Sequence, residues 1–171
     1  ARRIVAEFLR ASDPSEIAFT SCATESNNWA IFGALRANKS RRHIITSTVE
    51  HPSVLETSKT LNNDGYDVTF IEVNKNGGLD IDYLFDSIRG DTNIISLMAA
   101  NNETGVIFPI RELSESVKQR DPNIIFHTDA TQYIGKLPIN LQDDFQFIDL
   151  LSFSGHKIHG PKGIGGIFIR E

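Results

Sequence analysis

The chain has 171 residues, 40% of them hydrophobic and 23% charged, and a formal net charge of −5. This length suits one domain with a buried core, and the acidic balance gives no reason to expect nucleic acid or an anionic membrane as a partner. No apolar run approaches the ~20 residues of a membrane span, and the single cysteine, Cys22, excludes an intrachain disulfide framework and fits a reducing compartment such as the cytoplasm.

Short apolar runs alternate with amphipathic stretches along the chain, which is the pattern of an α/β fold. The pattern predicts a mainly parallel seven-stranded sheet with helices on both faces. The predicted strands are Ile17–Thr20, His43–Thr46, Val68–Val73, Ile94–Ala100, Ile124–Thr128, Leu150–Phe153 and Gly166–Arg170. The predicted helices are Ala1–Arg10, Asn27–Ala37, Ser53–Asn63, Asp80–Arg89 and Ile110–Gln119.

The connection before the last strand indicates the direction of that strand. The segment from His159 to Gly166 is rich in glycine and too short for a helical crossover. We therefore expect the last strand to run antiparallel to its neighbour. No internal repeat, low-complexity tract or interdomain linker interrupts the chain, so residues 1–171 are interpreted as part of one domain.

Two charged residues follow buried strands in the second half of the chain. Asp129 directly follows the predicted strand Ile124–Thr128, and Lys157 lies shortly after Leu150–Phe153. The carboxyl ends of parallel strands meet at one edge of a sheet, where ligands bind. A lysine can form a Schiff base with the aldehyde of pyridoxal phosphate (PLP), and an aspartate keeps the pyridine nitrogen protonated so that the ring accepts electrons. This pair predicts a PLP site.

Further polar residues follow other strands at the same edge. Thr24 opens a helix after the first strand, where free backbone N–H groups can hold a phosphate. His51 follows the second strand, and Asn102 and Gln132 follow the fourth and fifth. Each has a plainer interpretation: Thr24 as a helix cap, His51 as a structural imidazole, the others as turn residues. Five such strand ends on one edge are harder to attribute to chance, which favours a binding site.

Competing motifs fit the sequence less well. One glycine pair has phosphate-loop spacing, but Pro161 stands where that loop needs its lysine, and no G-x-G-x-x-G motif follows the first strand. His156 and His159, with His127 and Asp129, could be drawn into a metal site. The spacing is loose, however, and Lys157 between the first two histidines would repel a cation. No metal is therefore predicted.

Five longer segments carry specific motifs: Phe19–Asn28 (FTSCATESNN), Val49–Val54 (VEHPSV), Asn101–Gly105 (NNETG), His127–Gln132 (HTDATQ) and Ser152–Gly163 (SFSGHKIHGPKG). In this order they resemble the signature blocks of the cysteine desulfurases, the NifS/IscS-type enzymes of the class V aminotransferase family (PLP fold type I). The last block alone would indicate the wider class V group, and the second and third narrow the resemblance. It extends from about Ile17 to the end of the chain.

The resemblance implies a role for each matching residue. Lys157 would bond covalently to the PLP aldehyde, and Asp129 would face the pyridine nitrogen. Gln132 would bond the phenolic oxygen of the cofactor, with Asn102 beside it near the substrate. His51 would stack on the ring and assist proton transfers. The phosphate would be held by Ala23, Thr24, Ser154 and His156.

The resemblance also implies a reaction and its partners. L-cysteine would be converted to L-alanine while a separate cysteine thiolate takes the sulfur as a persulfide, for use in iron–sulfur cluster assembly. The implied partners are L-cysteine and an iron–sulfur scaffold or other sulfur-acceptor protein. The full-length parent would be a cytoplasmic homodimer.

The chain departs from the resembled family in its extent. That family carries its nucleophilic cysteine on a mobile loop well beyond the lysine, followed by a small C-terminal domain, whereas the sequence stops at Glu171. We therefore expect residues 1–171 to be an incomplete PLP-binding large domain, inactive by itself, and Cys22 not to be the nucleophile. The alternatives are another class V enzyme, such as a selenocysteine lyase or an epimerase-like member, and a non-catalytic scaffold fragment.

Overall fold

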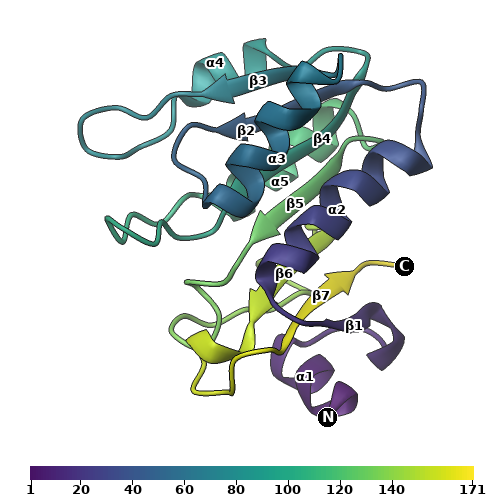
Figure 1. The fold of residues 1–171 in the computed structure, drawn as a ribbon, viewed down its shortest axis with the longest axis vertical. Coiled ribbons are helices and arrows are strands. Elements are labelled where there is room, and N and C mark those ends of the chain that lie inside the picture. Colours follow the sequence, from purple (N-terminus) through teal and green to yellow (C-terminus); the bar gives the residue numbers. More distant parts are fainter.

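A computed structural model describes all residues, 1–171, and its centre is one seven-stranded sheet (Figure 1). The strand order across the sheet is β1-β7-β6-β5-β4-β2-β3. All strands run parallel except β7, which is antiparallel to both of its neighbours, β6 and β1. The strands are β1 (Ile17–Thr20), β2 (His43–Ser47), β3 (Asp67–Ile71), β4 (Thr92–Met98), β5 (Ile125–Asp129), β6 (Leu150–Ser154) and β7 (Gly165–Ile169).

These strands confirm the predicted α/β class and the mainly parallel sheet, and no strand end differs from the predicted one by more than two residues. The antiparallel direction of the last strand is also confirmed. The sequence did not predict its position: β7 is an interior strand, between β1 and β6. The last strand therefore joins the beginning of the chain to the rest of the sheet.

The predicted helices form with adjusted ends. The longest, α2, begins at Ala23, four residues before its predicted start, because the polar residues after Cys22 already belong to its first turn. By contrast α4 ends at Asp86, since the Arg89 N–H donates to Thr92 Oγ1 and turns the chain into β4. The helices are α1 (Arg2–Leu9), α2 (Ala23–Ala37), α3 (Pro52–Asn63), α4 (Ile81–Asp86) and α5 (Ile110–Arg120), with short 3-10 turns η1 (Pro14–Glu16) and η2 (Gly155–Lys157).

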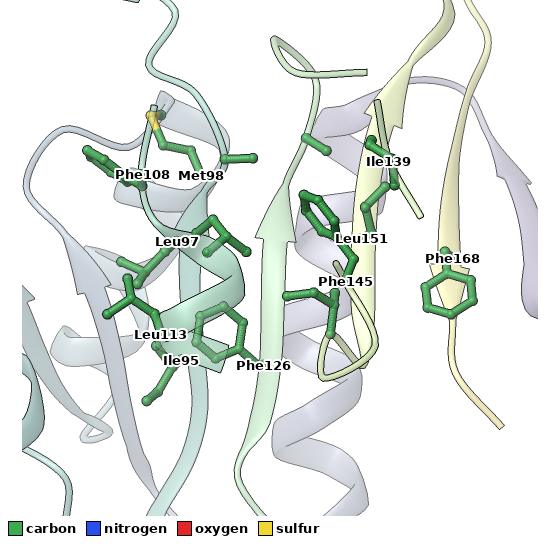
Figure 2. Packing of buried hydrophobic residues seen from close by; sticks show 14 of the residues in the cluster. Ile95, Leu97, Met98, Phe108, Leu113, Phe126, Ile139, Phe145, Leu151 and Phe168 are labelled. Atoms are coloured by element: carbon green, nitrogen blue, oxygen red, sulfur yellow. The ribbon is translucent and has the colours of Figure 1, made fainter. Parts of the chain in front are cut away.

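Two hydrophobic clusters lie on opposite faces of the sheet, because successive strand residues point to opposite sides. Ile94 on β4 belongs to the smaller cluster with Leu35 of α2, whereas its neighbour Ile95 belongs to the larger cluster. In Figure 2 the larger cluster brings Leu113 of α5 close to Ile95 and Phe126. Helices α2 and α3 thus cover one face and α5 the other, which confirms the prediction of helices on both faces (Figure 1).

The direction of the strands determines where a ligand can bind. Strands β1, β2, β4, β5 and β6 all end at the same edge of the sheet, so the segments that follow them converge there. This is the edge at which open α/β sheets bind ligands. None of the helices combines the length and apolar character needed to cross a membrane.

Candidate active site

A pocket of about 190 Å³ opens at this edge of the sheet. Its walls come from five different strand ends, so residues far apart in the sequence meet around one cavity. The lining residues are Cys22, Ala23 and Thr24 after β1; His51 after β2; Met98 and Ala100 from β4 and its extension; Asp129, Thr131 and Gln132 from β5 onward; and Ser154, His156 and Lys157 from β6 and η2.

The structure brings together every predicted site residue except Asn102. Asn102 is exposed on the turn after β4 and does not line the pocket. The buried residue of this turn is Asn101, whose Nδ2 donates to the Val49 carbonyl and whose Oδ1 accepts from the Thr104 N–H. Asn101 thereby ties the turn to the segment that precedes His51.

One end of the pocket is formed by the start of α2. Cys22 is the residue that precedes the first turn, and its backbone is extended, so the first N–H groups of the helix are free of intrahelical partners. Thr20 Oγ1 donates to the Cys22 carbonyl, and Ser26 Oγ donates to the Gly166 carbonyl of β7. The loop is therefore held at both ends against the sheet. Such a helix start favours an anion.

The opposite wall of this end comes from β6 and η2, and β7 supports the Cys22 loop from behind. Ser154 Oγ and His156 Nδ1 lie 2.9 Å apart and both residues line the pocket. Gly165 packs so closely on the loop that a β-carbon there would lie 2.7 Å from the backbone of Cys22. Hydroxyl, imidazole and backbone N–H groups thus surround one end of the cavity.

The Cys22 thiol belongs to this same end. The nearby Glu25 backbone N–H lowers the pKa of Cys22 below its usual value, against a smaller opposing effect of burial. A lowered pKa makes a thiol more reactive towards alkylating reagents without assigning it a catalytic role.

Asp129 lies at the end of β5 and is only 6% exposed. Its Oδ1 accepts the Thr131 N–H at 2.9 Å, and its Oδ2 accepts Asn27 Nδ2 at 2.7 Å. Both carboxylate oxygens are therefore oriented by N–H donors, which hold the side chain in one position beside the pocket.

His51 precedes the first turn of α3 and caps that helix with its ring. The Ser53 N–H donates to His51 Nδ1 at 3.2 Å, and Ser53 Oγ lies 2.8 Å from the same nitrogen. Pro52 occupies the first helical position, where its missing N–H is no loss. Lys157 lies across the pocket on η2, directly after β6, and its side chain is exposed.

Two buried titratable groups lie behind the pocket. Burial lowers the pKa of His127 to about 4, although the nearby Asp129 carboxylate opposes this shift; the ring bridges Ser96 Oγ at 2.8 Å and Ser152 Oγ at 2.9 Å. Burial also raises the pKa of Glu50 to about 8, and Asp129 adds to the rise. Glu50 Oε1 accepts the Met98 N–H, whereas its Oε2 is buried without a partner in the chain.

Sequence reasoning missed Asn27 and Ser53, which contact Asp129 and His51. One signal was present: Asn27 falls on the buried face of α2 with Ala30 and Ile31, where an apolar residue is expected. It also missed Thr131, a pocket-lining residue whose Oγ1 is buried without a partner in the chain. No sequence pattern pointed to that hydroxyl.

Comparison with known proteins identifies close relatives. The chain is 52% identical over 171 residues to a cysteine desulfurase of Nostoc sp., and 48% identical over 172 residues to the cysteine desulfurase IscS of Salmonella paratyphi B. All of the chain is aligned in both cases, but it spans only 42% and 41% of the length of these two relatives.

Solved structures share the fold at similar identity. A NifS-like protein superposes with a TM-score of 0.93 at 43% identity, over 99% of this chain and 46% of that protein. A structure described as SspA in complex with cysteine gives a TM-score of 0.91 at 42% identity, over 99% of this chain and 48% of that protein. The class V aminotransferase family model matches residues 1–171. The chain therefore belongs to the class V aminotransferase family.

Proposed function

We propose that the pocket binds PLP. The observation that carries this proposal is that Lys157 and Asp129, from neighbouring strand ends, converge on one cavity. The far end of this cavity is rich in hydrogen-bond donors that could hold a phosphate. The donor set fits the cofactor group by group: an amine for the aldehyde, a carboxylate for the pyridine nitrogen, and hydroxyl and N–H groups for the phosphate. The unpartnered Thr131 Oγ1 is a further polar atom that a bound ligand would satisfy.

Each residue would then hold one part of the cofactor. The α2 start at Ala23 and Thr24, together with Ser154 and His156, would bind the phosphate. Asp129 would keep a proton on the pyridine nitrogen, and the N–H groups of Thr131 and Asn27 would hold its side chain in position for this contact. Gln132 would bond the phenolic oxygen and His51 would cover the ring. The cofactor, when bound, supplies a conjugated ring that accepts electrons from the substrate Cα.

We further propose that the full-length protein is a cysteine desulfurase. The support is the identity of about half of all residues to relatives that carry this name, together with the five matching motifs. In this reaction the thiol sulfur of L-cysteine bonds to the sulfur of an enzyme cysteine as its bond to Cβ breaks. The enzyme thiol becomes a persulfide and the carbon skeleton leaves as L-alanine. Of the two thiol hydrogens, one stays on the persulfide and the equivalent of the other goes to Cβ, which becomes the methyl group of alanine.

In that reaction Lys157 would move a proton, with the assistance of His51, and Asp129 would hold one in place. The Lys157 amine would remove the proton from the substrate Cα. Asp129 would keep the ring cationic and so lower the cost of that removal. The sulfur acceptor would be a cysteine other than Cys22, because Cys22 lies with Thr24 and Ser154 at the phosphate end of the pocket.

The biological setting follows from the same proposal. The full-length protein would act as a cytoplasmic homodimer, take L-cysteine as substrate, and pass its persulfide sulfur to an iron–sulfur scaffold or another sulfur-acceptor protein. The related structure described as SspA in complex with cysteine supports the choice of substrate.

Incubation of the PLP-loaded full-length protein with L-cysteine and a thiol reductant tests the proposal directly. We expect L-alanine and sulfide in equal amounts, and neither product from a Lys157→Ala variant. Product from L-selenocysteine alone, or racemisation without sulfide, would assign the protein to another class V activity. If the protein leaves the absorption spectrum of added PLP unchanged, cofactor binding itself is contradicted.

A further inference from the structure

A continuous line of hydrogen bonds connects two walls of the pocket. It runs from Asp129 Oδ2 to Asn27 Nδ2 at 2.7 Å, from Asn27 Nδ2 to Ser53 Oγ at 2.8 Å, and from Ser53 Oγ to His51 Nδ1 at 2.8 Å. The four residues come from β5, α2, α3 and the residue before α3. These hydrogen bonds also fix the direction of donation, because each residue determines whether the next one donates or accepts.

The carboxylate of Asp129 fixes the orientation of the Asn27 amide. A carboxylate can only accept, so the amide must turn its NH2 group towards Asp129. In the reverse orientation the Asn27 oxygen would face the carboxylate oxygen, acceptor against acceptor. The amide has two N–H bonds, and the second one points to Ser53 Oγ. Asn27 is fully buried, so water does not compete for either bond.

The amide in turn fixes the direction of the Ser53 hydroxyl. Ser53 Oγ accepts from Asn27, which leaves its own hydrogen free for His51 Nδ1. An independent contact leads to the same conclusion. The Ser53 backbone N–H also points to His51 Nδ1, and a backbone N–H can only donate. Nδ1 is therefore an acceptor, and the hydrogen of the neutral ring lies on Nε2.

The arrangement leaves one polar atom of Asn27 unsatisfied. Its Oδ1 is buried without a partner in the chain, although most buried polar atoms in proteins have one. An apolar residue at this place on α2 would avoid that unsatisfied oxygen. The two N–H bonds are what an asparagine provides here that an apolar residue would not. Asn28, the next residue, fixes the same helix pair, since its Oδ1 accepts from Thr57 Oγ1 of α3.

We propose that Asn27 and Ser53 are positioning residues that hold His51 as its Nε2–H tautomer, so that the imidazole presents a hydrogen-bond donor to the occupant of the pocket. The proposal deepens the proposed function and rests on it for the nature of that occupant. The tautomer itself is set by Asp129, Asn27 and Ser53 and requires no ligand. The Asp129 carboxylate at one wall of the pocket is thereby linked to the His51 hydrogen-bond donor at the other wall.

The tautomer can be measured by nitrogen NMR of the full-length protein labelled with ¹⁵N-histidine, before and after loading with PLP. The His51 signals are identified by their absence from a His51→Gln variant. We expect an unprotonated Nδ1 and a protonated Nε2, with well-separated chemical shifts. A protonated Nδ1, or two averaged shifts, would overturn the proposal, whether or not the protein desulfurates cysteine.

Variants separate the contribution of the side chains from that of the backbone N–H. In Asn27→Ala and in Ser53→Ala we expect the two His51 shifts to move towards each other. If the wild-type shifts survive in both variants, the backbone N–H alone sets the tautomer and the role given to Asn27 and Ser53 is wrong.

Asn93→Ala is the matched control. Asn93 is also buried, donates two N–H bonds, to the carbonyls of Asn38 and Arg41, and leaves its Oδ1 unpartnered, but it lies outside the pocket. It should destabilise the fold about as much as Asn27→Ala while leaving the His51 shifts unchanged.

Kinetics of the PLP-loaded variants provide a second readout. We expect Asn27→Ala to lower kcat roughly ten- to a hundredfold with little change in KM for L-cysteine, because a misplaced pocket group slows the reaction more than it weakens binding. Asn93→Ala should retain the wild-type kcat. An unchanged kcat in Asn27→Ala, with a disturbed His51 tautomer, would show that the tautomer does not serve the reaction and would refute its proposed purpose.

Discussion

Gly165 and Cys22 are in direct backbone contact: a β-carbon on Gly165 would lie 2.7 Å from both Cα and the carbonyl carbon of Cys22, and 2.8 Å from the Phe153 carbonyl oxygen. Strand β7 therefore supports the loop at the start of α2 without any side chain between them. All three close atoms belong to the backbone, which cannot move aside as the end of a flexible side chain could.

This contact predicts that Gly165→Ala displaces the phosphate end of the pocket. We expect a loss of about 1–3 kcal/mol of unfolding free energy, typical of overpacking, and a weaker affinity for PLP. Gly33→Ala is the control, because a β-carbon there would meet Trp29 at an ordinary 3.7 Å. Equal PLP affinity in both variants, measured by absorption titration, would show that Gly165 does not support PLP binding.

Lys157 should be the residue that binds PLP covalently. Borohydride reduction of the PLP-loaded full-length protein, followed by peptide mapping, should find the pyridoxyl group on Lys157. Lys162, on the exposed turn before β7, is the comparison, since it does not line the pocket. A label that persists in Lys157→Ala and disappears in Lys162→Ala would reverse the assignment.

Asp129→Asn should leave PLP bound but slow removal of the substrate Cα proton roughly a hundredfold or more, since it deletes a preorganised charge. The amide is nearly isosteric, and its oxygen can still accept one of the two N–H bonds, from Asn27 or from Thr131. Stopped-flow absorption of the variant with L-cysteine gives the rate. Turnover close to that of the wild type would refute the role of Asp129 at the pyridine nitrogen.

The pKa of Glu50, which burial raises to about 8 from 4.5, predicts a pH-dependent stability difference. The folded state favours the protonated carboxyl, so its contribution is complete below about pH 4.5 and is lost as the pH rises towards 8. Relative to Glu50→Gln, the wild type should lose up to roughly 1.4 kcal/mol of unfolding free energy per pH unit in this window.

Urea unfolding of both proteins at several pH values measures that difference. His127, whose pKa burial lowers to about 4, titrates in both proteins and so cancels in the comparison. A difference that stays constant between pH 4.5 and 8, or that has the opposite sign, would show that Glu50 is ionised in the folded protein at neutral pH.

Cys22→Ser should leave sulfide release from L-cysteine largely intact in the full-length protein. The thiol lies at the phosphate end of the pocket, whereas the substrate sulfur would extend from Cα near Lys157. Alkylation of Cys22 does not decide the question, because the Glu25 N–H lowers the pKa of this thiol in any case. A protein limited to residues 1–171 should release no sulfide, and Cys22-dependent release from it would identify Cys22 as the nucleophile.

The sequence predicted the strands well because buried parallel strands read as short apolar runs, such as Ile94–Met98, between clear turns. It also predicted the direction of β7, since the length of the preceding connection limits the possibilities. The place of β7 between β1 and β6 could not be predicted in the same way. Strand order depends on pairings between distant segments, for which a single sequence contains no periodic signal.

The site was predicted where one residue type carries the chemistry by itself. Lys157 and Asp129 would each have a distinct role in the proposed PLP binding, and both line the pocket. Asn27 and Ser53 were missed because a buried amide or hydroxyl gains meaning only from its partners, which are Asp129 and His51 here. Asn102 was expected in the site and lies outside the pocket lining, since one turn residue can be exposed while its neighbour is buried.

The position of β7 also has a consequence for biosynthesis. The only strand paired with β1 is β7, through contacts such as Ile17 with Phe168, so β1 has no partner in the sheet until the ribosome has translated almost all of these residues. The loop after β1 and the Ser26 contact to Gly166 must wait for the same event. The strands from β2 to β6 can pair earlier, during translation. The part of the pocket at the start of α2 is therefore the last of the five strand-end segments to be held in place, and the proposed binding of PLP would have to follow this step.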